Sequence, residues 1–433
     1  MSPLASYRRL FSLAGPLYVA VAFVGRLPLA MSQMGALLLV AATTGSYGLG
    51  GAAAGALAVA NAVGAPVAGA LADRVGQRPV VLVQSLLGGA GLLLLVALAR
   101  GGASPALVIA SAALAGAAMP QIGPLARVRW RPITRQQGSR QPRLMEAAFS
   151  YEGAADEASF VLGPALLGLL VVVADPALAL VVAASVLLVF GCAFALHPTA
   201  RLAHAHRAAI DSGARLVTGV FVVLLVAQLL IGVVFGSIQT GTTVLATLAG
   251  QAGIAGLVHA SLGVGSVIAG LAVAALPARI GYATRVLVAA LGLAVLSSPL
   301  LLTDSVPQLF AVVLVLGFVV APYMISVFML GERAAPPSKV GTAMTLLAAA
   351  TGIGYAVGSG VAGRLADLHG HLGAFSVTVS AGVAAAVLAL ATQPLLRRLA
   401  GPGTSESSAA SAETAAPATS SALTAERTGL RGG

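Results

Sequence analysis

Long apolar runs separated by short polar connections make up most of the chain. A helix needs about 20 apolar residues to cross the hydrocarbon core of a bilayer. Runs of that length predict twelve transmembrane helices and place the chain among all-α membrane proteins. The predicted spans are residues 13–42, 48–71, 80–99, 105–126, 144–173, 176–196, 216–245, 252–277, 286–303, 307–330, 341–363 and 373–396.

The composition agrees with a protein whose outer surface faces lipid. Only 9% of the 433 residues are charged and 58% are hydrophobic, whereas a soluble domain carries roughly 25% charged residues. The net charge of +11 is better explained by cations that flank membrane spans than by a nucleic-acid surface. We therefore expect the lipid bilayer, and no nucleic acid, as a partner of a monomeric protein.

The positions of the cations predict the orientation in the membrane. Connections after even-numbered spans, together with both termini, hold 21 arginine and lysine residues, whereas the opposite connections hold 2. Six of the 21 are the arginines from Arg127 to Arg143, which we interpret as one loop. The positive-inside rule then places both termini in the cytoplasm and the spans in the cytoplasmic membrane.

A polar, basic stretch at 197–215 divides the chain, with six predicted spans on each side. This layout is typical of transporters built from repeated halves. We expect one six-helix bundle in 1–196 and a second in 216–396. Residues 397–433 are rich in Ser, Ala, Thr and Gly without apolar periodicity, so they are expected to form a disordered cytoplasmic tail.

The connection between the second and third predicted spans carries a polar motif, GALADRVGQRP, at 69–79. It resembles the signature loop of the major facilitator superfamily, and the matching positions include Gly69, Asp73, Arg74, Gly76 and Arg78. The resemblance implies two bundles that rock about a central cavity. It also implies that Asp73 docks at the cytoplasmic end of span 11, near Gly341, where a helix N-terminus attracts a carboxylate.

Other segments match the family only in part. The second-half counterpart, PARIGYATR, keeps Arg279, Gly281 and Arg285 but has no aspartate. The family's span 4 arginine is replaced by Ala113. The antiporter motif of span 5 is represented by Gly163-Pro164 and Gly168. This resemblance, together with an arginine to lysine ratio of 23 to 1, favours a bacterial efflux-type member.

Charged residues inside the predicted spans are the main candidates for function. Arg26 lies in the middle of span 1, where an ionised side chain must be paired or hydrated. Spans 1 and 5 are neighbours in the family, so we expect Arg26 to meet Asp156 or Glu157, with Glu152 as the third choice. These residues would bind substrate or protons, or else form a structural ion pair.

Weaker polar candidates for the substrate or proton site lie on spans 1, 7 and 10: Gln33, Gln228, Gln239 and Tyr323. Two small-residue pairs, Gly51-x-x-x-Gly55 and Gly354-x-x-x-Gly358, predict close approach of helices at the interface between the halves. We expect no metal and no cofactor, because the sequence shows neither a nucleotide-binding loop nor a plausible ligand cluster.

The sequence thus indicates a secondary transporter, not an enzyme, that moves a small solute by alternating access. Proton-coupled efflux of a drug-like or metabolite molecule is the leading interpretation. Uptake of a small anionic metabolite that pairs with Arg26 is the alternative. A membrane receptor or scaffold that transports nothing is the alternative from a different class.

Overall fold

The computed structural model describes residues 2–202, 214–251, 254–277 and 279–400. These residues form helices and their connections, and no strand occurs among them. Residues 203–213 of the central connection, and the part of the predicted tail from residue 401 onward, lie outside the described residues. Residues 397–400, which we predicted as the start of the disordered tail, form instead the end of a helix, so the prediction is wrong for this part.

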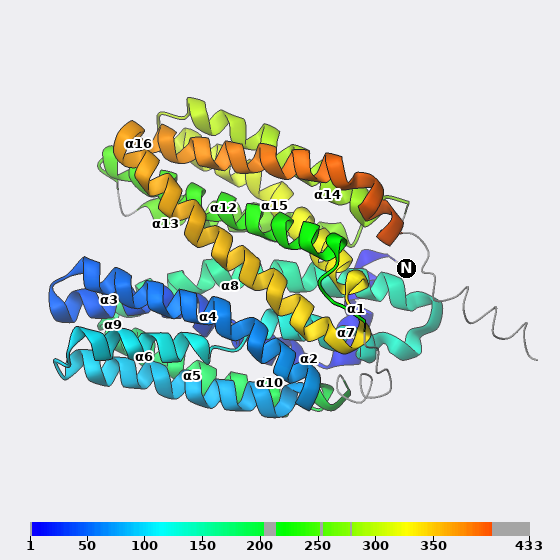
Figure 1. Cartoon of the computed structure of the whole chain (residues 1–433), viewed down its shortest axis with the longest axis horizontal. Helices are drawn as coiled ribbons and strands as arrows, with labels where there is room; N and C mark the ends of the chain where they lie inside the picture. Colours follow the sequence, from blue (N-terminus) through cyan, green and yellow to red (C-terminus); the bar gives the residue numbers. More distant parts are fainter. Residues whose placement is uncertain (1, 203–213, 252–253, 278, 401–433) are drawn as a thin grey trace, which may run out of the picture.

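Most helices of the first half of the chain form the lower lobe in Figure 1. They are α1 (Pro3–Ala14), α2 (Pro16–Val24), α3 (Leu27–Thr44), α4 (Tyr47–Val75), α5 (Gln77–Arg100), α6 (Pro105–Ala117), α7 (Ile122–Thr134), η1 (Arg135–Arg140), α8 (Gln141–Val173), α9 (Pro176–Val186), η2 (Leu187–Gly191) and α10 (Cys192–Leu196).

Most helices of the second half form the upper lobe in the same view. They are α12 (Gly219–Leu248), α13 (Ala255–Val273), α14 (Tyr282–Ser297), η4 (Ser298–Leu302), α15 (Val306–Ala334), η5 (Pro337–Lys339) and α16 (Val340–Ala400).

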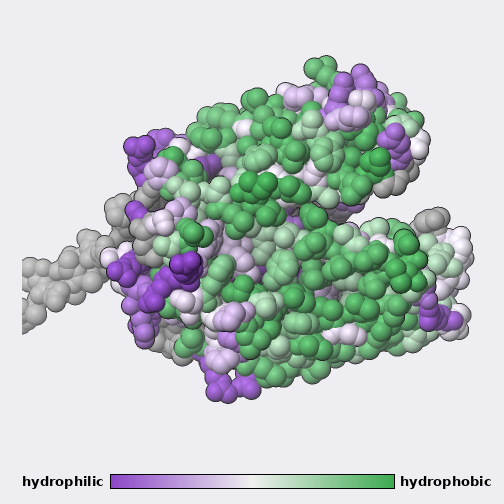
Figure 2. Space-filling model, turned by 180° about the vertical axis from the view of Figure 1, so that it is seen from behind, coloured by the Kyte–Doolittle hydropathy of each residue, from purple (hydrophilic) through white to green (hydrophobic). Residues whose placement is uncertain are grey.

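The two lobes meet at the end of the molecule that carries the N-terminus, where α1, α7 and the first turns of α16 lie together (Figure 1). We call this the arginine-rich end; it includes residues 73–78, 131–143 and 332–342. At the opposite end a notch separates the lobes, on the right of Figure 2, and we call this the open end. Apolar residues cover the flanks of both lobes in that view, as expected for surfaces that face lipid.

The helices are long and apolar enough for a multi-pass membrane protein. Ten helical segments among the described residues meet the length and hydropathy of a membrane span. Two of them, Pro105–Val173 with 69 residues and Pro337–Leu399 with 63, exceed twice the ~20 residues of one crossing. Each contains a glycine with positive φ, Gly138 at 52° and Gly370 at 63°, a conformation that favours glycine because it lacks a Cβ.

Side-chain caps help to set where several helices begin. Asp175 accepts a hydrogen bond from the Leu178 backbone N–H at 2.7 Å, which starts α9, and it also forms an ion pair with Arg100. The Leu178 N–H bond, more than the Arg100 charge, lowers the pKa of the Asp175 carboxyl. Thr218 caps α12 in the same way, through Phe221. Such caps satisfy backbone donors that the first helical turn leaves free.

Two predicted spans are broken helices. The run 13–42 is interrupted at Gly25 and Arg26, between α2 and α3. The fourth span is interrupted between α6 and α7, at a segment that contains Pro120, and proline cannot continue a backbone hydrogen-bond ladder. Helix α7 then runs on to Thr134, so our interpretation of Arg127–Arg143 as one loop is wrong for its first part.

The small-residue pairs behave differently from each other. A Cβ at Gly354 or Gly358 would clash with the α12 backbone, so this pair packs α16 tightly against α12 within the second lobe. Gly51 and Gly55 have no neighbouring atom within 4 Å of such a Cβ. The prediction that both pairs bring helices together at the interface between the halves is therefore wrong.

Candidate functional site

Arg26 lies at the break between α2 and α3 and is paired with acids of α8. Its Nη2 forms an ion pair with Glu152 Oε2, and its Nε lies 3.4 Å from Asp156 Oδ1. The Arg26 side chain is 4% exposed and that of Glu152 is fully buried. The predicted pairing with the fifth span is confirmed, with the third-choice residue Glu152 as the closest partner. Glu157 has no ion pair with Arg26.

A second buried arginine joins this cluster. Arg127 Nη2 lies 2.7 Å from Asp156 Oδ2, and the Arg127 side chain is 2% exposed. Its guanidinium carbon also lies 4.3 Å from the centre of the Phe328 ring on α15. Arg26 is therefore not the only cation deep in the protein. The sequence reasoning missed Arg127 because it ended the fourth span at residue 126.

We call Arg26, Arg127, Glu152 and Asp156 the charge cluster. Trp130, the only tryptophan of the chain, contacts the charge cluster by donating a hydrogen bond from Nε1 to Glu152 Oε1 at 2.6 Å. Tyr18 packs edge-on against Trp130, with 5.4 Å between ring centres. The cluster thus contains two arginines and two carboxylates, with the rings of Trp130 and Tyr18 packed beside it.

Several donors of the charge cluster have no acceptor among the described residues. They are Nη1 of Arg26 and both Nε and Nη1 of Arg127. A buried polar group without a hydrogen bond costs about 1–3 kcal/mol. Donors left in this condition, beside a helix break, are suited to bind a ligand that offers oxygen acceptors.

The two helix breaks meet at the cluster. Gly25 packs against the Ile122 side chain at the start of α7, and Gly123 packs against the Asp156 carboxylate. A Cβ at Gly123 would clash with Asp156 Oδ1. Broken helices with polar groups at the break are the usual way in which a transporter builds a binding site inside the membrane.

Asn61 of α4 supports the break between α6 and α7. Its Nδ2 donates to the carbonyl oxygens of Gly116 at 3.1 Å and Met119 at 3.2 Å, on either side of the end of α6. Gln121 donates in turn to Asn61 Oδ1 at 2.7 Å. The sequence reasoning missed both residues, although a single asparagine in an apolar run was a usable signal.

Asp73 binds the N-terminus of α16, as the family resemblance implied. Its Oδ1 accepts from the Gly341 backbone N–H at 3.0 Å, and its Oδ2 accepts from the Thr342 backbone N–H at 2.6 Å. A Cβ at Gly341 would clash with Asp73, and one at Gly69 would clash with Thr345. The contact therefore needs both glycines and joins the two lobes at the arginine-rich end.

Gly76 of the same motif forms the turn that follows α4. Gly76 ends α4 with φ at 95°, a conformation that favours glycine, and its N–H donates to the Ala72 carbonyl. Arg74 is exposed and Arg78 is half-buried.

Two further ion pairs join the lobes at the same end. Arg131 of α7 pairs with Glu332 of α15, including an Nη2 to Oε2 bond of 2.8 Å. Arg285 of α14 pairs with Glu146 of α8. Arg285 belongs to the second-half counterpart of the signature loop, which lacks an aspartate. In this counterpart the second lobe supplies the cation, Arg285, and the first lobe supplies the acid, Glu146. In the Asp73 contact the first lobe supplies the acid and the second lobe supplies the backbone donors.

The other predicted site residues form no hydrogen bond with the charge cluster among the described residues. Gln228 is buried and accepts from Thr351 Oγ1 at 3.3 Å, whereas Gln239 accepts from the Tyr355 hydroxyl at 2.6 Å. Gln33 is half-buried on α3.

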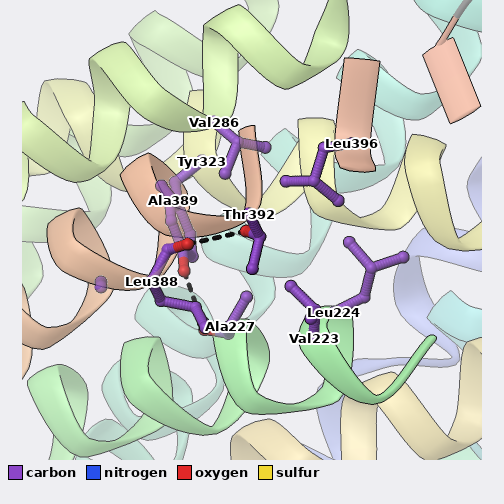
Figure 3. Close-up of a pocket in the computed structure, with 10 residues that line it drawn as sticks. Val223, Leu224, Ala227, Val286, Tyr323, Leu388, Ala389, Thr392 and Leu396 are labelled. Carbon is purple, nitrogen blue, oxygen red and sulfur yellow. Dashed lines mark hydrogen bonds between the residues drawn. The ribbon is translucent and has the colours of Figure 1, made fainter. Parts of the chain in front are cut away.

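Tyr323 lines a small pocket inside the second lobe (Figure 3). Its hydroxyl donates to the Ala227 carbonyl at 3.1 Å, and Thr392 donates to the Leu388 carbonyl at 2.7 Å. The other lining residues are apolar and come from α12, α14 and α16. Since no charged group lines this pocket, we regard the charge cluster as the better candidate site.

Two lobes of apolar helices, joined at one end by charged contacts, form the architecture of a multi-pass membrane protein. The family of the chain and its structural neighbours indicate a transporter and not an enzyme. The chain belongs to the Major Facilitator Superfamily, whose family model matches residues 18–344 and 224–427. No curated protein matches the chain.

Solved structures of transporters share the fold. The human organic anion transporter MFSD10 (TETRAN) is 22% identical, with a TM-score of 0.67, over 87% of this chain and 100% of that chain. A bacterial homologue of the iron transporter ferroportin, in an outward-facing state, is 14% identical, with a TM-score of 0.67, over 86% and 98%. The proton:xylose symporter XylE is 14% identical, with a TM-score of 0.67, over 87% and 95%.

Proposed function

We propose that this protein moves a small solute across the cytoplasmic membrane by proton-coupled alternating access, in the direction of efflux. The observation that carries the proposal is the charge cluster, which combines two ion-paired arginines with free donors at the meeting point of two broken helices. Intramembrane charges are costly, so they are rarely kept without a role.

The contacts between the lobes support alternating access. Asp73, Arg131 and Arg285 each hold a partner on the other lobe at the arginine-rich end, while the opposite end is notched (Figure 2). Each contact is polar and can exchange for water, so it can break when the lobes rock. This conformation corresponds to a transporter closed at one end and accessible from the other.

In this proposal the arginine-rich end is cytoplasmic and the open end faces outward, as the positive-inside rule requires. The two longest helical segments each cross the membrane twice, which brings the ten segments to twelve spans in two six-helix bundles, with both termini inside. The protein acts as a monomer, because one chain contains both lobes.

The charge cluster favours a solute with oxygen acceptors over one with a net negative charge. Arg26 already holds two carboxylates, so an anionic metabolite would have to displace one of them. The solved structures of the same fold include an organic anion transporter, a homologue of an iron transporter and a proton:xylose symporter, so the fold by itself selects no substrate. Gly163-Pro164 on α8, part of the antiporter motif, supports efflux.

The test is solute flux in proteoliposomes with an imposed pH gradient. A panel of radiolabelled metabolites and drug-like molecules is screened with the wild-type protein and with Arg26→Gln. We expect at least one compound to be concentrated by the pH gradient in wild-type vesicles and not in the variant. Binding without flux would instead identify a receptor, and flux that ignores the pH gradient would remove proton coupling.

A further inference from the structure

Glu157 follows Asp156 on α8 but points to a different side of the helix. Consecutive residues of an α-helix are about 100° apart. Asp156 therefore faces Arg26 and Arg127 in the first lobe, whereas Glu157 faces α13 of the second lobe. The Glu157 residue is 7% exposed.

The surface around Glu157 is a tightly packed seam between the lobes. Ala154 and Val161, three and four residues away on the same face of α8, lie against Gly270 and Gly263 of α13. Glu157 sits between these two contacts. We call the α8–α13 contact from Ala154 to Val161 the seam.

Glu157 is the predicted site acid that has no arginine partner in the charge cluster. Arg26 and Arg127 neutralise Glu152 and Asp156, and no arginine or lysine among the described residues forms an ion pair with Glu157. The nearest charge that acts on it is that of Asp156, which repels a second negative charge. An ionised carboxylate buried without a counter-charge is costly, so the neutral acid is the form that fits the seam.

The second lobe presents a polar group to this carboxyl. Ser266 of α13 is fully buried, and its side chain faces the Glu157 carboxyl. A hydroxyl can donate to a carboxylate or accept from a carboxylic acid, so it serves both protonation states. His259, two turns from Ser266 on the same face of α13 and toward the open end, is the one titratable residue of that helix.

We propose that Glu157 binds and releases the coupling proton at the seam, apart from the charge cluster that binds solute. The step is the reversible transfer of one proton between water and the Glu157 carboxylate. The Glu157 carboxylate takes up the proton while the open end is accessible to water. It releases the proton after the lobes separate at the seam and water reaches Glu157 from the arginine-rich end. Inward movement of one proton would then drive outward movement of solute, so this inference rests on the proposed transport function.

The experiment needs only the proton as ligand. Spin labels are placed at Ser104→Cys and Gln251→Cys, exposed positions near the open end of the two lobes, in a Cys192→Ser background. The distance between the labels is measured in purified, lipid-reconstituted protein over a range of pH. In the wild-type background we expect a shift from long to short distances as the pH rises, because ionised Glu157 disfavours the packed seam.

Variants separate Glu157 from its neighbours. Glu157→Gln resembles the neutral acid and should lose the shift, with long distances at every pH. Glu157→Asp keeps a titratable carboxyl and should retain the shift. His259→Gln is the matched control and should also retain it. A shift that persists in Glu157→Gln, or one that disappears in His259→Gln, would overturn the assignment.

The same data distinguish this inference from the proposed function. If the wild-type protein shows two distances whose proportions ignore pH, the proton site is wrong and alternating access stands. If it shows a single distance at every pH and with every solute of the flux panel, alternating access itself is contradicted.

Discussion

At the scale of single residues, burial decides which charges matter. Arg26 and Glu152 are both removed from water, and each needs the other because an uncompensated charge in a low-dielectric interior is expensive. Trp130 adds a hydrogen bond to the same carboxylate. Their exposed counterparts, such as the Arg100–Asp175 pair with side chains 56% and 43% exposed, contribute little to stability because water screens them.

We predict strong coupling between Arg26 and Glu152. Arg26→Gln or Glu152→Gln alone should lower the free energy of unfolding by roughly 3–5 kcal/mol, because each leaves a buried charge without its partner. The double variant should lose much less than the sum of the two. Unfolding by SDS in detergent micelles, followed by the fluorescence of Trp130, measures all three values.

Gln33→Leu serves as the control, since Gln33 is half-buried on the same helix as the Arg26 break and lies outside the charge cluster. It should change stability little. Additive losses in the double variant would mean that the two residues do not stabilise each other.

At the scale of helices, the ends and breaks carry the function. The N-terminus of α16 presents free N–H groups, and Asp73 from the other lobe accepts two of them. The breaks in the first and fourth predicted spans place backbone and side-chain polar groups where continuous helices would bury only apolar surface. These features concentrate polar groups at the ends and breaks of helices.

Asp73→Asn should shift the protein away from the conformation in which the lobes meet at the arginine-rich end. Asparagine keeps one acceptor but loses the charge, and a charge at a helix end is worth about 0.3–2 kcal/mol. That range corresponds to a change of about 2- to 30-fold in the ratio of the two conformations. The spin-label pair at positions 104 and 251 measures this ratio.

Asp304→Asn removes an exposed carboxylate at the open end and should leave the ratio unchanged. Equal ratios in Asp73→Asn and the wild-type protein would show that the Asp73 contact does not hold the lobes together.

At the scale of the whole molecule, the end that is rich in arginine is also the end at which the two lobes are closed against each other. The arginine-rich end holds the contacts between the lobes, and the opposite end is notched (Figure 2). A closed cytoplasmic side and an accessible outer side follow if the positive-inside rule applies.

Cysteine labelling tests this orientation. In a Cys192→Ser background, Ser139→Cys at the arginine-rich end should resist an impermeant thiol reagent in intact cells, because it faces the cytoplasm. Ser104→Cys should react under the same conditions, and both should react after the cells are opened. Labelling of residue 139 from outside would reverse the orientation and with it the direction of the proposed transport.

The sequence by itself determined the membrane class, the approximate positions of the spans and the need of Arg26 for a partner, because hydropathy and charge cost are local properties. The Asp73 contact with Gly341 was predictable only through the family resemblance. The disorder of the tail beyond residue 400 and the roles of the site residues stay predictions.

Only the tertiary structure decided which acid Arg26 meets. Asp156 and Glu157 are equally apolar-flanked in the sequence, but the rotation of α8 sends one to the charge cluster and the other to the second lobe. The Arg131–Glu332 and Arg285–Glu146 pairs join residues 201 and 139 positions apart, a distance over which no local pattern carries information. Helix periodicity is set by neighbouring residues, whereas the partner of each helix face is set by how the lobes pack.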